Sequence, residues 1–297
     1  MSSQVRLDGG RINRNRPISF SFDGKKYSAF EGDTIASALL ANGLSVIGRS
    51  WKYHRPRGII GDGAEEPNAL FQIEKGALTI PNVRGTQAEV YDGMIVKSTN
   101  AWPSVNFDIM SFFGLFSRML PAGFYYKTFM WPAKFWMFYE SVIRRASGLG
   151  EAPTETDPDH YEKTNDHCDV LVVGSGPAGL MAALTAGRAG ARVLLADEQA
   201  EFGGRLLADN NEIDGSPAIE WVANVIAELE FMPDVRLLKR STVFGYHDGN
   251  FATISERLLD HLSLKDRDPQ AAREKVWRVR AKHVVLATGA HERPIVF

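Results

Sequence analysis

Apolar and polar positions alternate in two short segments near the N-terminus. The alternation over residues 18–22 and 27–30 is typical of strands with one buried face, and the Asp-Gly pair at 23–24 favours a tight turn between them. The next apolar run, at residues 35–41, follows a Gly-Asp-Thr start signal and stops at the Asn-Gly pair at 42–43, which predicts a short helix. A hairpin followed by a helix predicts a small β-grasp domain.

A second pattern begins near Asp169. An unbroken apolar run at 170–173 predicts a buried strand, residues 177–188 have the period of a helix, and residues 192–196 predict a second strand. Strand, helix and strand in this order predict a βαβ unit with parallel strands. The apolar run that begins at His283 ends in a small-residue turn and predicts another buried parallel strand.

Aromatic residues are concentrated between these two patterns. Residues 101–150 are rich in Trp, Phe, Tyr and Met, and residues 151–166 turn polar and acidic, which indicates a linker. Prolines and charged residues interrupt the apolar stretch from Phe112 to Tyr139, so it lacks the roughly 20 uninterrupted apolar residues of a membrane span. We expect the aromatic side chains from Trp102 onward to be buried against another domain or subunit. Three parts are predicted: a β-grasp domain at 11–100, an aromatic helical segment and linker at 101–166, and a dinucleotide-binding domain at 167–297.

Composition changes this picture little. A chain of 297 residues with 44% apolar and 24% charged residues can bury two cores. The formal charge of −2 gives no general attraction to nucleic acid or anionic lipid, so neither nucleic acid nor membrane is an expected partner. The basic and aromatic run at residues 49–57 offers a local alternative, a nucleic-acid patch in which Trp51 and Tyr53 stack on bases.

The single cysteine, Cys168, limits the chemistry further. One thiol cannot form an internal disulfide or a four-cysteine metal or iron–sulfur site within the chain. The seven histidines show no metal-ligand spacing, so no metal site is predicted. The arginine-rich N-terminus lacks the apolar core of a secretory signal, and we expect a cytoplasmic location.

The clearest chemical signal is the sequence Gly-Ser-Gly-Pro-Ala-Gly that starts at Gly174. It follows a predicted strand and opens a predicted helix, which is the context of a dinucleotide-binding loop. Gly174 makes the tight turn, Gly176 lets a pyrophosphate approach the backbone, and Gly179 lets the helix pack on the strand. Pro177 and Ala178 stand at the helix N-terminus, whose free N–H groups face the phosphates.

Two acidic residues follow the second strand of this unit. A carboxylate at this place accepts hydrogen bonds from the adenosine ribose, and either Asp197 or Glu198 could supply it. A 2′-phosphate would be repelled, and no arginine is expected at the strand tip, although Arg205 could reduce the penalty. We therefore predict NAD in preference to NADP, with FAD as the alternative because its ADP half makes the same demands.

Two further segments could complete the site. Residues 202–205, which include Gly203 and Gly204, could bring backbone close to the nucleotide or could be a plain loop. Residues 242–245 have a β-like pattern and could be an ordinary strand.

Several motifs together resemble known flavoproteins. Residues 197–199, 202–204 and 287–290 are similar to the flavoprotein disulfide-reductase-like group, and the strings at 49–58 and 121–132 resemble the alpha subunits of heterotetrameric sarcosine oxidases. This second resemblance covers essentially the whole chain. It implies an α/β and α+β fold, with a Rossmann-like dinucleotide-binding domain of the FAD/NAD(P)-binding flavoprotein type, incomplete here. A ferredoxin-like β-grasp domain is expected to precede it.

The resemblance also implies an activity and an assembly. The family's alpha subunits bind NAD and assemble with beta, gamma and delta subunits for the oxidative demethylation of sarcosine by oxygen. The amine is oxidised at FAD on the beta subunit, FMN lies at the alpha–beta interface, and tetrahydrofolate captures the one-carbon product on a C-terminal portion missing here. The chain is then expected to be the N-terminal part of an oxidoreductase subunit, inactive alone, and no catalytic residue is assigned to it.

Two alternatives stay open at this point. A related amine, opine or proline dehydrogenase subunit would hold a bound flavin in this domain. A non-catalytic scaffold subunit would hold a structural dinucleotide and dock its partners through the aromatic segment.

The family pattern adds residues to the nucleotide site. It implies that Gln199, Arg205 and Val243 line the nucleotide, Val243 through its backbone to the adenine, and that an Ala-Thr-Gly turn lies beside it. The expected nucleotide-binding residues are Gly174, Gly176, Pro177, Ala178, Gly179, Asp197, Glu198, Gln199, Gly204, Arg205, Val243, Thr288 and Gly289.

In related subunits, such as those of hydrogen cyanide synthase, the β-grasp domain resembles a plant-type ferredoxin and holds a two-iron cluster. Alignment with that motif places Gly61, Glu66, Ala69 and Thr86 where cysteines would ligate the cluster. The resemblance therefore implies a cluster-free 2Fe-2S-ferredoxin-like domain that packs and positions.

Overall fold

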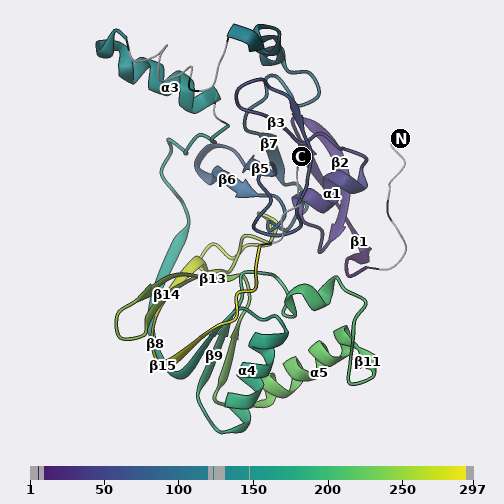
Figure 1. Ribbon diagram of the computed structural model, residues 1–297, viewed down its shortest axis with the longest axis vertical. Coiled ribbons are helices and arrows are strands. Elements are labelled where there is room, and N and C mark those ends of the chain that lie inside the picture. Colours follow the sequence, from purple (N-terminus) through teal and green to yellow (C-terminus); the bar gives the residue numbers. More distant parts are fainter. Residues whose placement is uncertain (1–5, 7–9, 120–122, 124–130, 147, 292–297) are drawn as a thin grey trace. The chain divides into compact units, whose positions relative to one another are not determined.

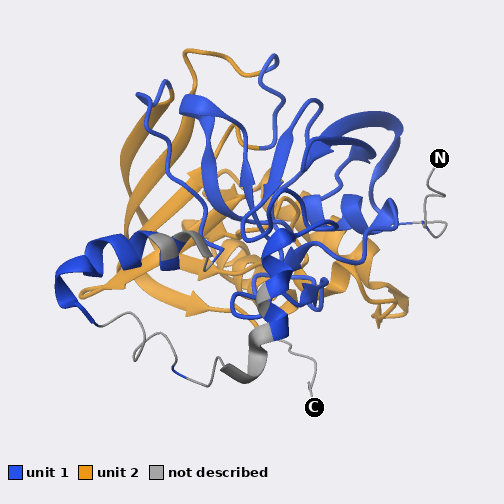
Figure 2. Ribbon diagram, turned by 90° about the horizontal axis from the view of Figure 1, so that it is seen from above, with its two compact units in different colours: residues 1–158, 261–266, 291–297 blue, residues 159–260, 267–290 orange. Residues whose placement is uncertain are grey.

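The chain forms two compact units, coloured separately in Figure 2. The structure is a computed structural model that describes residue 6 and residues 10–119, 123, 131–146 and 148–291. Unit 1 comprises Met1–Pro158, His261–Asp266 and His291–Phe297, and unit 2 comprises Asp159–Asp260 and Arg267–Ala290. Each unit has a hydrophobic core of its own.

Unit 1 contains a five-stranded sheet with the strand order β2-β1-β7-β5-β6 (Figure 1). Its elements are β1 Asn13–Phe22, β2 Lys25–Glu31, α1 Ile35–Ala41, β3 Gly48–Arg49, β4 Pro56–Arg57, β5 Leu70–Ile73, η1 Gly76–Leu78, β6 Ile80–Arg84 and β7 Ile95–Ser98. The strands β1 and β2 are joined by a two-residue turn in which Asp23 and Gly24 both have positive φ, 46° and 80°. The predicted hairpin and the predicted helix over residues 35–41 are therefore confirmed.

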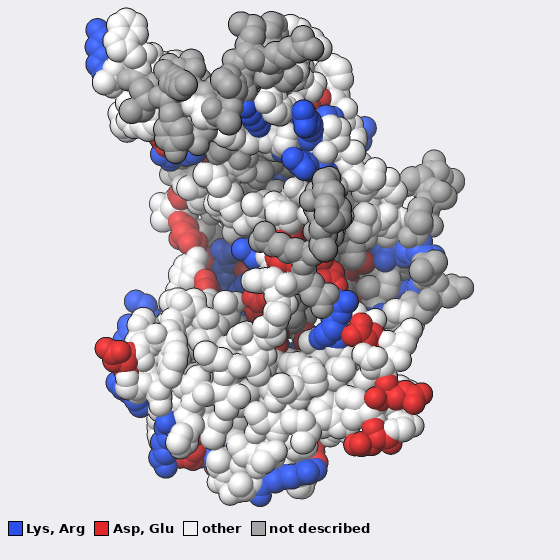
Figure 3. All heavy atoms as spheres, in the orientation of Figure 1, with Lys and Arg blue, Asp and Glu red and all other residues white. Residues whose placement is uncertain are grey.

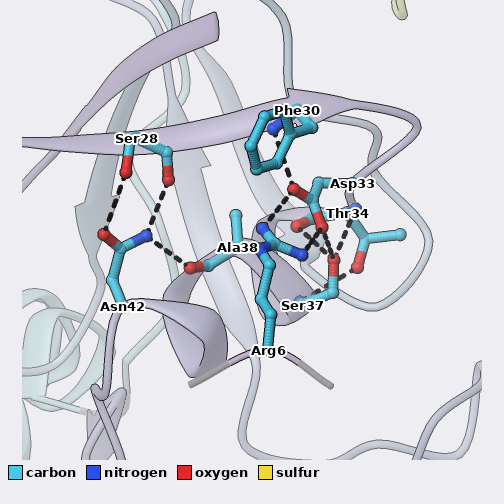
Figure 4. A network of polar contacts seen from close by, with 8 residues as sticks. All are labelled: Arg6, Ser28, Phe30, Asp33, Thr34, Ser37, Ala38 and Asn42. Carbon is cyan, nitrogen blue, oxygen red and sulfur yellow. Dashed lines mark hydrogen bonds and ion pairs between the residues drawn. The ribbon is translucent and has the colours of Figure 1, made fainter. Parts of the chain in front are cut away.

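The start of α1 is fixed by a buried carboxylate (Figure 4). Asp33 accepts hydrogen bonds from the backbone N–H of Phe30 at 2.9 Å and from the hydroxyl of Ser37 at 2.8 Å. The guanidinium of Arg6 donates to both oxygens of the same carboxylate, at 3.1 and 2.5 Å. Thr34 caps the helix by accepting from the Ser37 amide, so the polar side chains here satisfy the helix terminus.

The aromatic segment that follows is partly helical, as expected. It contains η2 Ile109–Met119, η3 Ala133–Phe135 and α3 Trp136–Ala146. Its described side chains are largely exposed, Trp131 for example to 81%, and their burial against another domain or subunit stays a prediction. The exposed members are Trp102, Phe107, Ile109, Phe112, Leu115, Trp131, Phe135, Trp136, Met137 and Phe138.

Residues 120–122 and 124–130, which carry most of the string compared with the family above, lie outside the described residues. Burial against a partner subunit stays a prediction. Among the helices of the described residues, none has the length and apolar character to cross a membrane.

Unit 2 is built on a six-stranded sheet with the order β12-β9-β8-β15-β14-β13. The strands β12, β9, β8 and β15 are parallel, and β14 and β13 continue the sheet antiparallel. Its elements are β8 His160–Val173, α4 Pro177–Arg188, β9 Val193–Ala196, η4 Gly204–Leu207, β10 Glu212–Ile213, β11 Ser216–Pro217, α5 Ala218–Phe231, β12 Val235–Leu238, β13 Ser241–His247, β14 Phe251–Arg257 and β15 Ala272–Leu286.

Both faces of the central strands of this sheet are buried. Leu195 packs with Leu180 of α4 and Leu229 of α5, the two helices that lie together against the sheet in Figure 1. Its neighbour Leu194 points to the opposite face, where it packs with Ile254 of β14. Burial on both faces explains the unbroken apolar runs in the sequence.

Two predictions for unit 2 need correction. Residues 160–166, interpreted as part of a linker, form the first half of β8 and pair with the first half of β15. A strand whose side chains are exposed can pair with its neighbour without an apolar pattern, so the polar sequence of residues 160–166 did not predict a strand. The strand that includes His283 is parallel as predicted, but its end is not buried in the described structure, because Leu286 is 62% exposed.

Candidate functional site

The turn between β8 and α4 can accept only glycine at two positions. Gly174 has a φ of +96°, and a Cβ there would lie 2.5 Å from the carbonyl oxygen of Ala287. A Cβ on Gly179 would lie 1.9 Å from the carbonyl oxygen of Gly174. These two glycines therefore serve the close packing of the turn on the helix and on the end of β15.

Gly176 differs from both. No heavy atom lies within 4 Å of the position that a Cβ would occupy on it, and its φ of −63° is open to any residue. Gly176 caps α4, no side chain caps the helix there, and Pro177 and Ala178 are exposed. Open space beside a bare helix N-terminus fits the pyrophosphate of a dinucleotide.

The carboxylate of Asp197 holds this turn in place. It is only 9% exposed, and Oδ2 accepts hydrogen bonds from both the backbone N–H and the hydroxyl of Ser175, each at 2.7 Å. Oδ1 accepts from the backbone N–H of Gln199 at 2.8 Å. Both oxygens are thus bound by the protein itself, whereas Glu198 is half-buried at the end of the strand.

A second glycine pair lies directly on the first loop. Gly203 donates its N–H to the carbonyl of Ser175 at 3.1 Å, and a Cβ on Gly204 would lie 2.9 Å from the Cα of Gly176. These contacts bring the backbone of residues 202–205 close to the glycine loop, and its approach to a nucleotide stays a prediction. Arg205 is exposed and pairs with Asp209 at 3.4 Å, a surface contact of small energy.

The remaining expected residues gather at the same edge of the sheet. The backbone N–H of Ser241 bonds the carbonyl of Asp197 at 2.7 Å, which brings the start of β13 and Val243 to the end of β9. The turn after β15 places Thr288 3.3 Å from the Cβ position of Gly174, and Gly289 follows with a φ of +67°. The loops named from the sequence therefore converge at the carboxyl ends of parallel strands, where such sheets bind ligands.

Two arginines from other parts of the chain reach this edge, although none stands on the tip of β9 itself. The guanidinium of Arg257 donates from Nη2 to the carbonyl of Glu198 at 2.9 Å. The backbone of Arg240 accepts from the N–H of Arg257 at 3.1 Å and donates to the carbonyl of Gln199 at 2.9 Å. Nothing in the sequence near the βαβ motif points to these residues, because β13 and β14 bring them back from later in the chain.

Cys168 lies in the core of unit 2, away from these loops. Burial, together with the carboxylates of Asp166 and Asp169, raises the pKa of its thiol to about 11. It therefore stays protonated at neutral pH and is a poor nucleophile.

In unit 1, the loop compared with the ferredoxin motif is closed by a carboxylate. Glu66 is 3% exposed, and its Oε2 accepts from the backbone N–H groups of Ile60 and Gly61, each at 2.6 Å. Its Oε1 accepts from the N–H of Asn68 at 2.7 Å, and the hydroxyl of Thr86 donates to the carbonyl of Gly63.

The four positions compared with cluster ligands therefore do not fit an iron–sulfur cluster. They offer no thiol, and the Glu66 carboxylate is already bound by three amides. Within the described residues, no group of three His, Cys, Asp or Glu side chains is arranged to hold a metal ion.

Replacing Glu66 with alanine should destabilise unit 1 by roughly 2–4 kcal/mol, because it leaves three partly buried N–H groups without their acceptor. Glu66→Gln keeps one acceptor oxygen and should cost less. Glu31→Ala, which removes an exposed acid of the same unit, should change stability by less than about 1 kcal/mol. Urea unfolding measures the stability of all three variants. Equal losses of stability in Glu66→Ala and Glu31→Ala would contradict the claim that the Glu66 carboxylate holds the loop through its hydrogen bonds.

Charge on the visible face of unit 2 forms no basic patch. Figure 3 shows a largely uncharged surface over this unit, with lysine, arginine and acidic side chains scattered at its margins. The run at residues 49–57 contains Arg49, whose guanidinium is bonded to the carbonyl of Val105 and so helps hold its own loop. These contacts give Arg49 a structural role and no support to a nucleic-acid patch.

Comparison with family models divides the chain in the same way. Residues 15–101 match the 2Fe-2S iron-sulfur cluster binding domain, and residues 169–242 match FAD dependent oxidoreductases. The two matches and the two sheets confirm the predicted fold class, a ferredoxin-like β-grasp domain followed by a Rossmann-type domain. The second match also indicates a flavin-related dinucleotide cofactor.

Relatives are similar to the chain over its whole length. Sarcosine oxidase subunit alpha of Rhizobium meliloti (strain 1021) is 53% identical over 300 residues, which cover 100% of this chain and 30% of the relative. The subunit of the same name from Corynebacterium sp. (strain U-96) is 40% identical over 296 residues, 99% of this chain and 26% of the relative. The resemblance inferred from the sequence is thereby confirmed, and the chain spans less than a third of these relatives.

A solved structure supports the fold. The crystal structure of L-proline dehydrogenase from P. horikoshii matches with a TM-score of 0.57 at 18% identity, covering 100% of this chain and 45% of that one. At this identity the match shows a shared architecture.

Proposed function

We propose that this chain, similar along its entire length to the N-terminal part of sarcosine oxidase alpha subunits, is the NAD-binding part of such a subunit. The complete enzyme would be an oxidoreductase acting on CH–NH groups, with sarcosine as its substrate. The observation that carries the proposal is the open space beside Gly176 at the N-terminus of α4. The turn that contains Gly176 is held in place by the hydrogen bond from the Ser175 N–H to the Asp197 carboxylate.

Specific residues would hold the dinucleotide. The N–H groups of the first turn of α4 would bind the pyrophosphate, and the backbone of Val243 would bind the adenine. Glu198 is the better candidate for the adenosine ribose, because Asp197 is occupied by Ser175 and Gln199. Gln199, Arg205, Thr288 and Gly289 would line the remainder. A bound nicotinamide supplies hydride transfer, and the described residues of this chain contribute binding and orientation.

Partners would complete the enzyme. We infer beta, gamma and delta subunits, FAD on the beta subunit, FMN at the alpha–beta interface, and tetrahydrofolate on a more C-terminal part of the alpha subunit. The exposed side chains Trp131, Met137 and Phe138 support a subunit contact, because large apolar patches on monomers are rare. A single cysteine suits a reducing compartment such as the cytoplasm.

A second candidate function follows from the match of residues 169–242 to FAD dependent oxidoreductases. The site would then hold FAD in a related amine, opine or proline dehydrogenase subunit. The ADP halves of FAD and NAD would use the same glycines and acid.

Direct titration separates these functions. NAD should bind the full chain and should be preferred to NADP and FAD in calorimetry. Sarcosine turnover should appear only after assembly with the partner subunits. Tighter binding of FAD, with the visible spectrum of an oxidised flavin in the purified chain, would replace the first function by the second.

A further inference from the structure

The guanidinium of Arg6 is held at its edge by a carboxylate and on its face by an aromatic ring (Figure 4). Its two terminal nitrogens donate to the two oxygens of Asp33, Nη1 to Oδ1 at 3.1 Å and Nη2 to Oδ2 at 2.5 Å. Its central carbon lies over the ring of Phe30, 5.3 Å from the ring centroid. A planar, forked cation therefore meets the two kinds of partner that suit it, a carboxylate in its plane and an aromatic ring across its face.

The carboxylate of Asp33 is also fixed by groups other than Arg6. It is fully buried, Oδ2 accepts from the backbone N–H of Phe30, and Oδ1 accepts from the hydroxyl of Ser37. The backbone of Asp33 is held as well, because its N–H donates to the carbonyl of Phe30 at 3.0 Å and its carbonyl accepts from the N–H of Val90 at 2.8 Å. The turn between β2 and α1 therefore sets the orientation of the two oxygens that face the cation.

A carboxylate as deeply buried as that of Asp33 needs a positive charge beside it, because an unpaired ion in a protein interior is costly. Within the described residues, Arg6 is the cation that contacts it, from 27 positions earlier in the chain, and 14% of the Arg6 side chain is exposed. The Nε atom of Arg6 is buried without a hydrogen-bond partner among the described atoms, so the two terminal nitrogens make the polar contacts. These contacts involve only the end of the side chain, which a small guanidinium ion shares.

We propose that Asp33 and Phe30 form a guanidinium-binding site, which Arg6 occupies in this chain and which accepts the same group from a separate molecule when Arg6 is removed. The site fastens the segment that carries Arg6 to the start of α1. A lysine fits it less well, because an ammonium group lacks the planar fork that matches two carboxylate oxygens. This inference is independent of the dinucleotide proposal, because these residues belong to unit 1 and the nucleotide loops belong to unit 2.

Thermal unfolding of the full chain in the presence of methylguanidinium chloride tests the proposal. Arg6→Ala should lower the melting temperature of unit 1 by about 5 °C or more, because it leaves a buried charge unpaired. Methylguanidinium, at a concentration that does not change the melting temperature of the unaltered chain, should raise that of Arg6→Ala. Methylammonium at the same concentration, which carries the charge without the fork, should not. Adding Asp33→Asn to Arg6→Ala should abolish the difference between the two salts, and adding Phe30→Leu should reduce it.

Arg16→Ala is the matched control for the loss of an arginine. Arg16 is 70% exposed and pairs with Glu31 at 3.0 Å in the same unit, so its removal should shift the melting temperature little and should create no response to methylguanidinium. If Arg6→Ala is already unfolded at low temperature, circular dichroism measures the recovery of folded protein in the two salts. Equal effects of the two salts, a methylguanidinium response that survives Asp33→Asn, or an unchanged melting temperature of Arg6→Ala would each overturn the proposed site.

Discussion

Gly176→Ala should weaken dinucleotide binding by roughly 10- to 100-fold while leaving the fold intact, whereas Gly179→Ala should disrupt the fold itself. A Cβ on Gly176 would enter space where no protein atom lies within 4 Å, and the backbone angles there suit alanine. The same atom would obstruct a pyrophosphate, and inserting a methyl group into a close-packed contact typically costs about 1–3 kcal/mol. The expected loss is therefore in binding.

Gly179→Ala should mainly reduce stability, because the added Cβ would clash with the protein itself and not with the ligand. Its Cβ would lie 1.9 Å from the backbone oxygen of Gly174, and the backbone there is held between β8 and the end of β15. We expect destabilisation by more than about 3 kcal/mol. Thermal unfolding and NAD titration of both variants measure the contrast. A Gly176→Ala protein that binds NAD normally would place the pyrophosphate elsewhere.

Asp197→Ala should destabilise unit 2 by about 3 kcal/mol or more and lower nucleotide affinity as a consequence. The substitution leaves two N–H groups and one hydroxyl without their acceptor, and each buried unsatisfied donor costs about 1–3 kcal/mol. Asp197→Asn keeps one acceptor oxygen and should fall between alanine and the unaltered chain. Asp209→Ala, which removes a half-exposed acid paired with Arg205, should cost less than about 1 kcal/mol.

Urea unfolding of Ser175→Ala, Asp197→Ala and the double variant tests whether the Asp197–Ser175 contact accounts for the loss of stability. If Asp197 acts through Ser175, the effects of Ser175→Ala and Asp197→Ala should sum to more than the effect of the double variant. The rival interpretation, in which Asp197 binds the ribose directly, predicts unchanged stability of Asp197→Ala and a loss confined to nucleotide binding.

The elements that could be predicted from the sequence are those that short-range patterns and turn or cap residues determine. The hairpin around the Asp-Gly turn, the helix starting at Ile35 and the helix from Pro177 to Arg188 appear where the patterns place them. The glycine spacing also identified the loop at Gly174 correctly, because steric demands at a tight turn depend on nearest neighbours.

Contacts between residues far apart in the chain could not be predicted from local sequence patterns. The choice between Asp197 and Glu198 depends on the Ser175 contact, which periodicity does not reveal. Arg257 returns to Glu198 from 59 residues later through the order of the strands. The described aromatic side chains between Trp102 and Phe138 are largely exposed in this chain, and an apolar sequence predicts cover without saying whether the same chain or a partner supplies it.

The most direct test of the central claim is the identity of the nucleotide that the purified chain carries. Mass spectrometry of the material released on denaturing the protein, after saturation with a mixture of NAD, NADP and FAD and removal of excess ligand, should find NAD in stoichiometric amount. Recovery of NADP or FAD in its place, or of no dinucleotide from folded protein, would contradict the account.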